Sequence, residues 1–296
     1  MSASLLSNII LDGKVIPVDD ARVRLSSRLA MYGEGCFDTI RAYEGGFLHP
    51  EKHLARLHKG ITFLGWETPE PFCDMHAFME IMTLFLKSNR VMDQHVRIRV
   101  QVWADDHTSG YIPGSASTRV LIAGSLLESG GKNRIKPVSL GTSQYRRIPA
   151  SALPPEVKWT NGINYILAAR DAQKKQVDDA LMLTHSGFVS ETTIANIFWK
   201  TSGTIFTPSE DCDLLPGVTR SVLLEIFERS GIPLETGSFS LKMLADADSA
   251  WVCNSVREIC PVARLDDHRF APDTEFMNSL SDQFDNYKRE HIRYAR

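Results

Sequence analysis

Apolar and polar positions in the first third of the chain predict strands joined by tight turns, followed by a helix. Two short apolar runs around Asp12-Gly13, in residues 8–18, are typical of a β-hairpin, and residues 36–48 repeat the arrangement around Gly45-Gly46. A helix should start at Pro50, because proline suits the first helical position and apolar residues then recur at helical spacing, at Leu54, Leu57, Ile61 and Leu64.

Apolar spacings typical of helices and strands continue to residue 124. A second helix is expected over 72–87, and a strand is expected at 95–103, where apolar residues alternate at Val96, Ile98, Val100 and Val102. Together these elements predict one small α+β domain, residues 1–124.

Polar residues and Gly130-Gly131 then interrupt the pattern, so a linker is expected at 125–133. The remaining residues, 134–296, predict a second and larger domain. Its expected elements are a proline-rich loop, a helix over 162–175, strands at 180–185 and 187–190, a hairpin at 196–208, a helix after Pro216-Gly217 and a polar C-terminal helix.

Composition and charge narrow the class of protein. At 296 residues with 43% hydrophobic content, the chain can bury a large core divided between two domains. Lys and Arg total 33 against 36 Asp and Glu, for a formal net charge of −3. Neither a basic surface for nucleic acid nor an acidic tail is present, so no nucleic-acid partner is expected.

Cysteine usage and the N-terminus predict where the protein resides. An odd, scattered set of cysteines without a C-x-x-C pair fits reduced thiols in the cytosol better than a disulfide framework or a zinc site; they are Cys36, Cys73, Cys212, Cys253 and Cys260. The N-terminus has no basic region and its apolar run breaks at Asp12-Gly13, so neither a signal peptide nor a membrane span is expected. These features predict a cytoplasmic protein that does not bind membranes.

A metal site is not expected. His49, Glu51 and His53 partly match the helix of zinc proteases, but the glutamate is not at the required position and Pro50 blocks the preceding turn. We therefore interpret these histidines as surface or core-edge residues.

Lys158 is the first candidate for chemistry. It lies between Val157 and Trp159, just before a helix that Thr160 or Asn161 could cap. Partial burial and the positive end of the helix dipole would both favour the neutral amine, which is a nucleophile that forms a Schiff base with an aldehyde or carbonyl compound. The alternative interpretation is an ordinary solvent-exposed lysine beside a loop.

Three other positions each have a functional and a structural interpretation. Glu191 ends a strand-like segment, where its carboxylate could pair with a protonated pyridine nitrogen or simply cap a turn. Arg56 lies off the apolar stripe of its helix, where it could be solvated or bind a phosphate. The Pro216-Gly217 turn leads into a helix whose N-terminal N–H groups could hold an anion, or could merely be well capped.

Several segments that contain these residues follow one another along most of the chain: YGEGCFDTIRAYEGGFLHPEKHLARL, VKWTN, DDALMLTHSGFVSETTIANIFW, TIFTP, LLPGVTR and VCNSVREICPV. In this order they resemble the class IV aminotransferases, the pyridoxal-phosphate enzymes of fold type IV. The resemblance implies an α+β fold of two domains, with a small N-terminal α/β domain and a larger cofactor-binding domain that has a pseudo-barrel β core and helices. It also implies a homodimer in which a loop of the neighbouring subunit completes the active site.

The resemblance assigns roles to individual residues. It implies that Lys158 forms the Schiff base with pyridoxal 5'-phosphate and moves the proton between the substrate Cα and the cofactor C4′. Glu191 would pair with the pyridine nitrogen. The further cofactor-binding residues would be Arg56, Asn196, Val218, Thr219 and Ser255, and the substrate side would be lined by Tyr32, Phe37 and Arg41, with Arg41 binding a carboxylate.

The expected reaction moves an amino group between an amino acid or primary amine and a 2-oxo acid. An alternative is a 4-amino-4-deoxychorismate lyase that forms 4-aminobenzoate and pyruvate, and a remote one is a non-catalytic binding protein with the same fold. Branched-chain enzymes typically carry Gly, Glu and Gly-Thr where this chain has Thr39, Ala195 and Asn254-Ser255. The segments GCFDTIR, ANIFW and CNS are closer to the lyases and to D-amino-acid-type members, so the substrates stay open.

Overall fold

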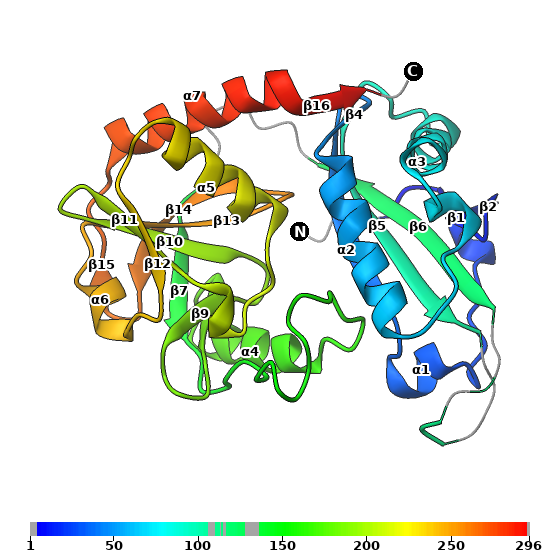
Figure 1. Ribbon diagram of the computed structural model, residues 1–296, viewed down its shortest axis with the longest axis horizontal. Helices are drawn as coiled ribbons and strands as arrows, with labels where there is room; N and C mark the ends of the chain where they lie inside the picture. Colours follow the sequence, from blue (N-terminus) through cyan, green and yellow to red (C-terminus); the bar gives the residue numbers. More distant parts are fainter. Residues whose placement is uncertain (1–4, 106–109, 113, 115–116, 128–135, 295–296) are drawn as a thin grey trace. The chain divides into compact units, whose positions relative to one another are not determined.

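The chain divides into two compact units. The computed structural model describes residues 5–105, 110–112, 114, 117–127 and 136–294 (Figure 1). The first unit comprises residues 1–129, 157–161 and 291–296, and the second comprises residues 130–156 and 162–290. The boundary between Ser129 and Gly130 falls inside the range predicted as a linker, most of which lies outside the described residues. The predicted second domain, 134–296, is interrupted, because two short segments of it belong to the first unit.

An antiparallel sheet forms the first unit, with strand order β16-β4-β3-β5-β6-β1-β2. The strands are β1 (Asn8–Leu11), β2 (Lys14–Pro17), β3 (Cys36–Tyr43), β4 (Gly46–Leu48), β5 (His95–Ala104), β6 (Thr118–Leu126) and β16 (Ile292–Tyr294). The helical elements are the 3-10 turns η1 (Val18–Asp20) and η2 (Glu70–Phe72) and the helices α1 (Arg28–Tyr32), α2 (Pro50–Phe63) and α3 (Met75–Ser88).

Strand alternation separates the two faces of this sheet. Even-numbered residues of β3 and β5, such as Ile40 and Ile98, are fully buried in the core that α2 and α3 cover (Figure 1). Both predicted hairpins are present. The second one turns at Glu44 and Gly45, which have positive φ, and not at Gly45-Gly46 as predicted. Gly46 belongs to β4 and pairs with Tyr294 of β16.

The short segment 157–161 is fixed to β3 by backbone hydrogen bonds. Phe37 N–H donates to the Lys158 carbonyl at 2.9 Å, and Thr160 N–H donates to the Gly35 carbonyl at 2.8 Å. Val157 is buried in the core of the first unit. The backbone of the candidate lysine is therefore held by the small N-terminal unit.

A strand ring is the centre of the second unit. Strands β10, β13, β14, β7, β8 and β9 follow one another, and β9 pairs again with β10, which closes the ring. The strands are β7 (Val138–Thr142), β8 (Asp179–Leu183), β9 (Val189–Thr192), β10 (Asn196–Thr201), β11 (Thr204–Pro208), β12 (Leu234–Gly237), β13 (Ser249–Asn254), β14 (Glu258–Leu265) and β15 (His268–Arg269). This closed core confirms the predicted fold type IV architecture.

Alternation along β10 fills the ring and attaches a helix to its outside. Ile197 and Trp199 are buried in the interior cluster, whereas Phe198 stacks on Trp251 and meets Phe227 of α5. The helical elements of this unit are α4 (Ile163–Lys174), η4 (Glu210–Cys212), α5 (Val218–Arg229), α6 (Leu241–Ala245) and α7 (Thr274–His291). The elements predicted for this unit are present, but the cap of α4 is Gly162, not Thr160 or Asn161, and it makes no side-chain cap hydrogen bond.

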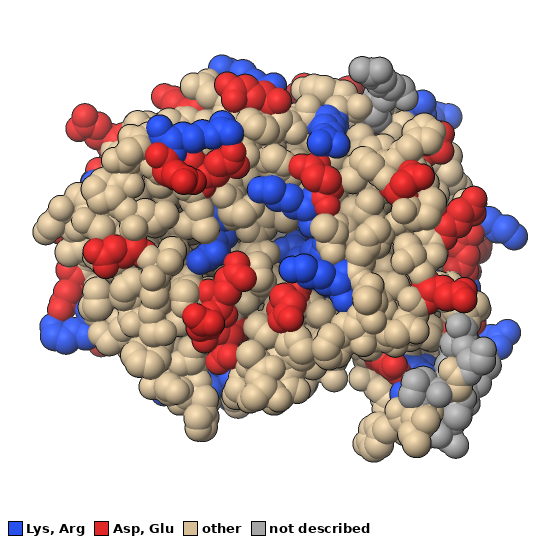
Figure 2. Space-filling model, viewed as in Figure 1, with Lys and Arg blue, Asp and Glu red and all other residues tan. Residues whose placement is uncertain are grey.

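Charged side chains of both signs are interspersed on the face shown in Figure 2, in keeping with the net charge of −3. In the parts of the chain that the structure describes, every helix is too short or too polar to cross a bilayer.

Helix α2 approaches β3 so closely at Gly60 that an alanine Cβ there would lie 2.7 Å from both Cβ and Sγ of Cys36. Alanine normally favours a helix over glycine by about 1 kcal/mol. We expect Gly60→Ala instead to destabilise the protein by about 1–3 kcal/mol, because the helix must move off the strand. Urea unfolding measures the difference, and the exposed neighbour Lys59→Ala is the control. A gain in stability in Gly60→Ala would contradict this close packing.

Candidate active site

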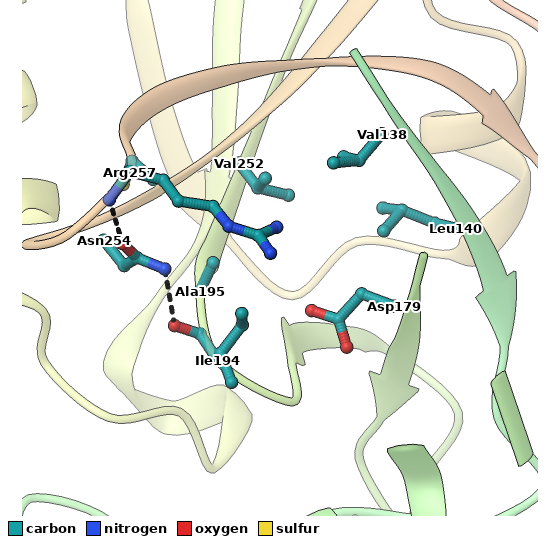
Figure 3. Close-up of a pocket in the computed structure, with 9 residues that line it drawn as sticks. Val138, Leu140, Asp179, Ile194, Ala195, Val252, Asn254 and Arg257 are labelled. Atoms are coloured by element: carbon teal, nitrogen blue, oxygen red, sulfur yellow. Dashed lines mark hydrogen bonds between the residues drawn. The ribbon is translucent and has the colours of Figure 1, made fainter. Parts of the chain in front are cut away.

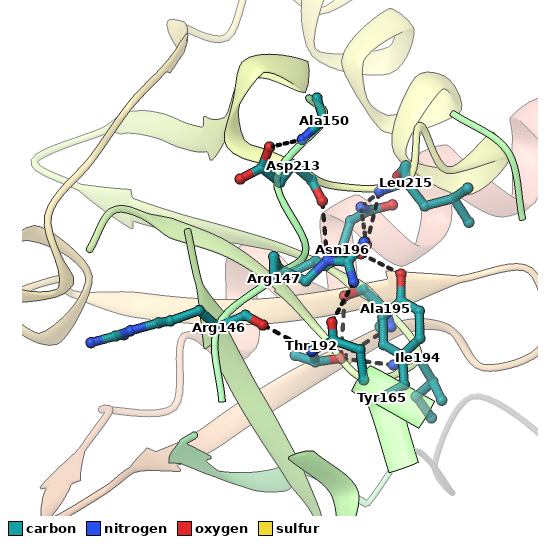
Figure 4. A network of polar contacts seen from close by, with 12 residues as sticks. Arg146, Arg147, Ala150, Tyr165, Thr192, Ile194, Ala195, Asn196, Asp213 and Leu215 are labelled. Atoms are coloured by element: carbon teal, nitrogen blue, oxygen red, sulfur yellow. Dashed lines mark hydrogen bonds and ion pairs between the residues drawn. The ribbon is translucent and has the colours of Figure 1, made fainter. Parts of the chain in front are cut away.

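Tyr165, Asn196 and Leu215 belong to a polar network in the second unit (Figure 4), and all three donate hydrogen bonds to the carboxylate of Glu191. Glu191 is only 4% exposed and lies on β9, where its backbone pairs with Asn196 of β10 and closes the strand ring. One oxygen, Oε1, accepts a hydrogen bond from the Tyr165 hydroxyl at 2.9 Å. The other, Oε2, accepts from Leu215 N–H at 3.2 Å and from the Asn196 amide at 3.4 Å.

Arg147 supplies the positive charge beside this carboxylate. Its Nε lies 3.2 Å from Glu191 Oε1, and both side chains are almost completely buried. The guanidinium donates from Nε to the Asp213 carbonyl at 3.0 Å and from Nη1 to the Asn164 side chain at 2.9 Å. Its Cζ also lies 4.4 Å from the centroid of the Tyr165 ring. A single guanidinium thus contacts the acid, the loop before α5 and helix α4.

Tyr165 remains a neutral hydrogen-bond donor in this network. Burial, followed by the charge of Glu191, raises the pKa of its hydroxyl well above the ordinary value. Sequence reasoning gave Arg147 no role, because its contact with Glu191 joins residues far apart in the chain. A cofactor contact of Tyr165 had little weight, because its spacing from Lys158 differs from that of the tyrosine in the enzymes that the chain resembles. The one available signal was that both lie in segments flanking the candidate Lys158.

The turn before α5 is built for close backbone approach. A Cβ on Gly217 would lie 2.1 Å from Asn196 Oδ1, so only glycine fits at this helix N-cap. Asn196 also donates to the Leu215 carbonyl at 3.0 Å. Gly217 has no side chain to cap α5, so the first N–H groups of the helix, those of Val218 and Thr219 among them, have no side-chain cap at this position. A helix start of this kind can bind an anion.

Ser255 lies in the turn between β13 and β14, which Asn254 shapes. Asn254 Oδ1 accepts hydrogen bonds from the N–H groups of Val256 and Arg257, at 2.9 and 2.7 Å, and its amide donates to the Ile194 carbonyl at 3.2 Å. This asparagine therefore ties the Ser255 turn to the β9–β10 turn.

A small pocket lies beside this turn (Figure 3). Its walls include Val138, Leu140 and Val252, and Asp179 and Arg257 point toward one another across it (Figure 3). Its volume is about 10 Å³, which is the size of a single water site.

In the first unit, Arg56 is oriented by a buried aspartate. Asp38, on β3, is fully buried and accepts hydrogen bonds at 2.8 Å from Arg56 Nε to Oδ2 and from Arg56 Nη2 to Oδ1. His53 Nδ1 lies 3.0 Å from Asp38 Oδ1. Burial alone would raise the pKa of Asp38, but the charges of Arg56 and His53 lower it well below its usual range.

This arrangement corrects two sequence interpretations. His53 is 2% exposed and belongs to a buried ionic cluster, so it is not a surface or core-edge residue as predicted. Arg56 is not simply solvated, because one edge of its guanidinium binds Asp38. Among the described residues, no group of three or more His, Cys, Asp or Glu side chains is arranged to hold a metal ion.

Lys158 lies beside a positively charged region of the first unit. Its Nζ is 4.9 Å from the centroid of the Phe37 ring, and the Arg99 Cζ is 3.5 Å from the same centroid. Arg41 shares the Phe37 face of β3 and pairs in register with Arg97 of β5. Burial and the Arg97 charge lower the pKa of Arg99 to about 10. These cations make the region suited to binding a carboxylate.

The remaining predicted residue, Tyr32, ends the short helix α1. Its ring lies 5.1 Å from the Arg28 guanidinium and 5.5 Å from the ring of Tyr111. The predicted residues thus fall into two groups. Tyr32, Phe37, Arg41, Arg56 and Lys158 belong to the first unit, and Glu191, Asn196, Val218, Thr219 and Ser255 belong to the second.

Comparison with known proteins identifies the family. The amino-transferase class IV family matches residues 35–265, so the chain belongs to the class IV aminotransferases. These are pyridoxal-5'-phosphate-dependent enzymes.

Individual relatives carry two different names. An aminodeoxychorismate lyase of Bacillus subtilis is 28% identical to this chain, and the matched region covers 88% of this chain and 87% of the lyase. A Methanocaldococcus jannaschii protein assigned as a branched-chain-amino-acid aminotransferase is 30% identical to this chain. The matched region covers 87% of this chain and 88% of that protein. The crystal structure of a branched-chain aminotransferase from Thermoproteus uzoniensis with norvaline has a TM-score of 0.88 at 23% identity, covering 99% of this chain and 100% of that one.

The residues present fit this cofactor. A pyridinium nitrogen needs a buried anion, a phosphate needs N–H donors, and an aldehyde needs an amine. The second unit offers the Glu191 carboxylate and the uncapped start of α5, and the first unit offers Lys158 and Arg56.

The Asp38 cluster should contribute to the free energy of unfolding in a way that depends on pH. Asp38→Asn removes the fully buried carboxylate that pairs with Arg56 and His53, which should cost about 3–5 kcal/mol at neutral pH. Because the folded-state pKa of Asp38 is lowered, its contribution is present above the unfolded pKa of about 4 and is lost as pH falls below it.

Denaturant unfolding of wild type and Asp38→Asn between neutral pH and pH 3 measures this contribution. The gap between the two proteins should shrink as pH falls, whereas the exposed Asp93→Asn should match wild type throughout. A gap that stays constant with pH would show that the Asp38 charge does not stabilise the fold.

Proposed function

We propose that this protein transfers an amino group between an amino acid or primary amine and a 2-oxo acid, with both groups of residues acting on one pyridoxal phosphate. The observation that carries the proposal is the buried Glu191 carboxylate, which is hydrogen-bonded directly to the turn that begins α5. The carboxylate and the turn that can bind an anion are thus held at a fixed distance. Such a fixed distance is needed to recognise a pyridine nitrogen and a phosphate that belong to one molecule.

Each residue then has a role. Glu191 accepts the pyridinium N–H, and the N–H groups of Val218 and Thr219 bind the phosphate together with Ser255 and Arg56. Asn196 positions the α5 turn. When bound, the cofactor supplies an electron sink that stabilises the charge left at the substrate Cα after loss of its proton.

Lys158 moves the proton. Its Nζ takes the proton from the substrate Cα and later returns one, which requires the amine to be neutral when it acts. Arg41 binds the substrate carboxylate, and Phe37 and Tyr32 line the substrate side. A homodimer in the cytoplasm is the expected form. The free cysteines and the balanced charge of the chain support this setting, without a nucleic-acid partner.

A second candidate function is 4-amino-4-deoxychorismate lyase, because relatives from Bacillus subtilis and Vibrio harveyi, each 28% identical, are named aminodeoxychorismate lyases. Both reactions need Lys158 and the same cofactor contacts. They differ after the proton is removed, since a transaminase must leave the amino group on the cofactor whereas a lyase releases 4-aminobenzoate and pyruvate.

Replacing Lys158 by alanine tests the assigned chemistry. We expect Lys158→Ala to lose the visible absorbance of the covalently held cofactor and to lose about 10²–10⁴-fold or more in turnover, because the proton-transfer group is gone. Lys59→Ala, which removes an exposed lysine, should retain both. Full turnover in Lys158→Ala would exclude the proposed role.

A half-reaction screen separates the two functions. The wild-type holoenzyme is mixed with L- and D-amino acids, (R)-1-phenylethylamine or aminodeoxychorismate, and products are analysed by chromatography. A transaminase should convert the cofactor to pyridoxamine phosphate with at least one amino donor. Formation of 4-aminobenzoate without pyridoxamine phosphate would instead support the lyase.

A further inference from the structure

We infer that Arg147 is the positioning residue that holds Glu191 as an anion and fixes that carboxylate to the turn that begins α5. This inference rests on the proposed function, in which Glu191 faces the pyridine nitrogen. It adds a residue to which neither the sequence nor the family comparison assigns a role.

The contacts of Arg147 show why an arginine is needed here. Its side chain is 6% exposed, its Nε lies 3.2 Å from Glu191 Oε1, and the N–H on Nε donates to the Asp213 carbonyl. An Nε carries one hydrogen, so its link to Glu191 is a charge contact and its hydrogen bond belongs to Asp213. A lysine could not make both contacts and also stack on Tyr165.

Asp213 connects this guanidinium to the anion-binding turn. Its backbone is left-handed, with φ 57°, and its side chain accepts a hydrogen bond from Ala150 N–H at 2.9 Å. The segment from 147 to 150 is therefore joined to Asp213 at both ends. Leu215, two residues on, donates its N–H to Glu191. The acid and the start of α5 consequently form one hydrogen-bonded unit with Arg147 between them.

Other charged groups near Glu191 do not replace Arg147. In the described part of the second unit, Tyr165 is a neutral donor to Oε1, and Arg220 of α5 interacts electrostatically with Glu191. Arg220 donates to the Pro208 carbonyl at 2.8 Å and pairs with Glu210, its Nη1 lying 3.9 Å from Glu210 Oε1. The Arg147 guanidinium, in contrast, lies in direct contact with the carboxylate, at 3.2 Å from Oε1.

Arg146 offers a matched control one residue away. Its side chain is exposed and points away from the network, whereas only its carbonyl takes part, accepting from Asn164 at 2.9 Å (Figure 4). Arg146→Gln removes the same charge from the same loop without touching Glu191.

The test is a titration of the apoprotein with pyridoxal phosphate from pH 5 to 9, followed by tryptophan fluorescence. Arg147→Gln should weaken cofactor binding at neutral pH by about 10–100-fold, the loss expected for a contact to a charged group. The acidic limb of its binding profile should move up by about 1–3 pH units, because the cation that favours ionised Glu191 is gone. Arg146→Gln should match wild type in both respects.

Two further variants separate positioning from mere structural support. Arg147→Lys keeps the positive charge but not the planar fork, so its acidic limb should stay near that of wild type while its affinity falls. In a protein that already carries Glu191→Gln, Arg147→Gln should weaken cofactor binding much less. The fold-loss of cofactor affinity caused by Arg147→Gln should be smaller by a factor of about 10 or more than in the wild-type background. If Arg147→Gln does not fold, Arg147→Lys still decides the point, because an affinity equal to that of wild type would overturn the inference.

Equal affinity and an equal pH profile in wild type and Arg147→Gln would overturn the inference. So would the same loss of affinity in both Glu191 backgrounds, because Arg147 would then act through some other group. Failure of wild-type protein to bind the cofactor at all would instead count against the proposed function.

Discussion

Closure of the strand ring at Glu191 and Asn196 is the constraint on which the rest of the structure depends. Backbone pairing of these two residues joins β9 to β10 and puts a carboxylate and an amide side by side in a buried seam. A buried carboxylate is costly unless it is paired and hydrogen-bonded. Arg147, Tyr165, Asn196 and the Leu215 N–H satisfy it, and they recruit α4 and the α5 turn to do so.

The same principle organises the small unit. Asp38 lies in the core beneath α2, where it is tolerated because Arg56 and His53 surround it. In both units a buried acid therefore fixes a side chain or turn to which the proposed function gives a role, so the structural clusters and the proposed site share residues. This sharing is why a substitution at a site residue should change both stability and cofactor binding.

Much of the fold follows from local patterns in the sequence. The alternation at Val96, Ile98 and Val100 gave β5, and Pro50 with its helical apolar stripe gave α2, because each pattern extends over one element. The return of β16 to β4 and the re-pairing of β9 with β10 have no such local signal, since they join segments through tertiary packing. The same holds for Arg147 and Asp38. Asp213 lies 66 positions from Arg147 and Arg56 lies 18 positions from Asp38, so only folding brings these partners together.

A crystal structure of the protein with pyridoxal phosphate tests the central claim most directly. We expect the pyridine nitrogen within hydrogen-bond distance of Glu191, the phosphate on the N–H groups of Val218 and Thr219, and Lys158 Nζ bonded to the aldehyde carbon. A cofactor bound with its ring nitrogen away from Glu191, or its phosphate away from the start of α5, would contradict it.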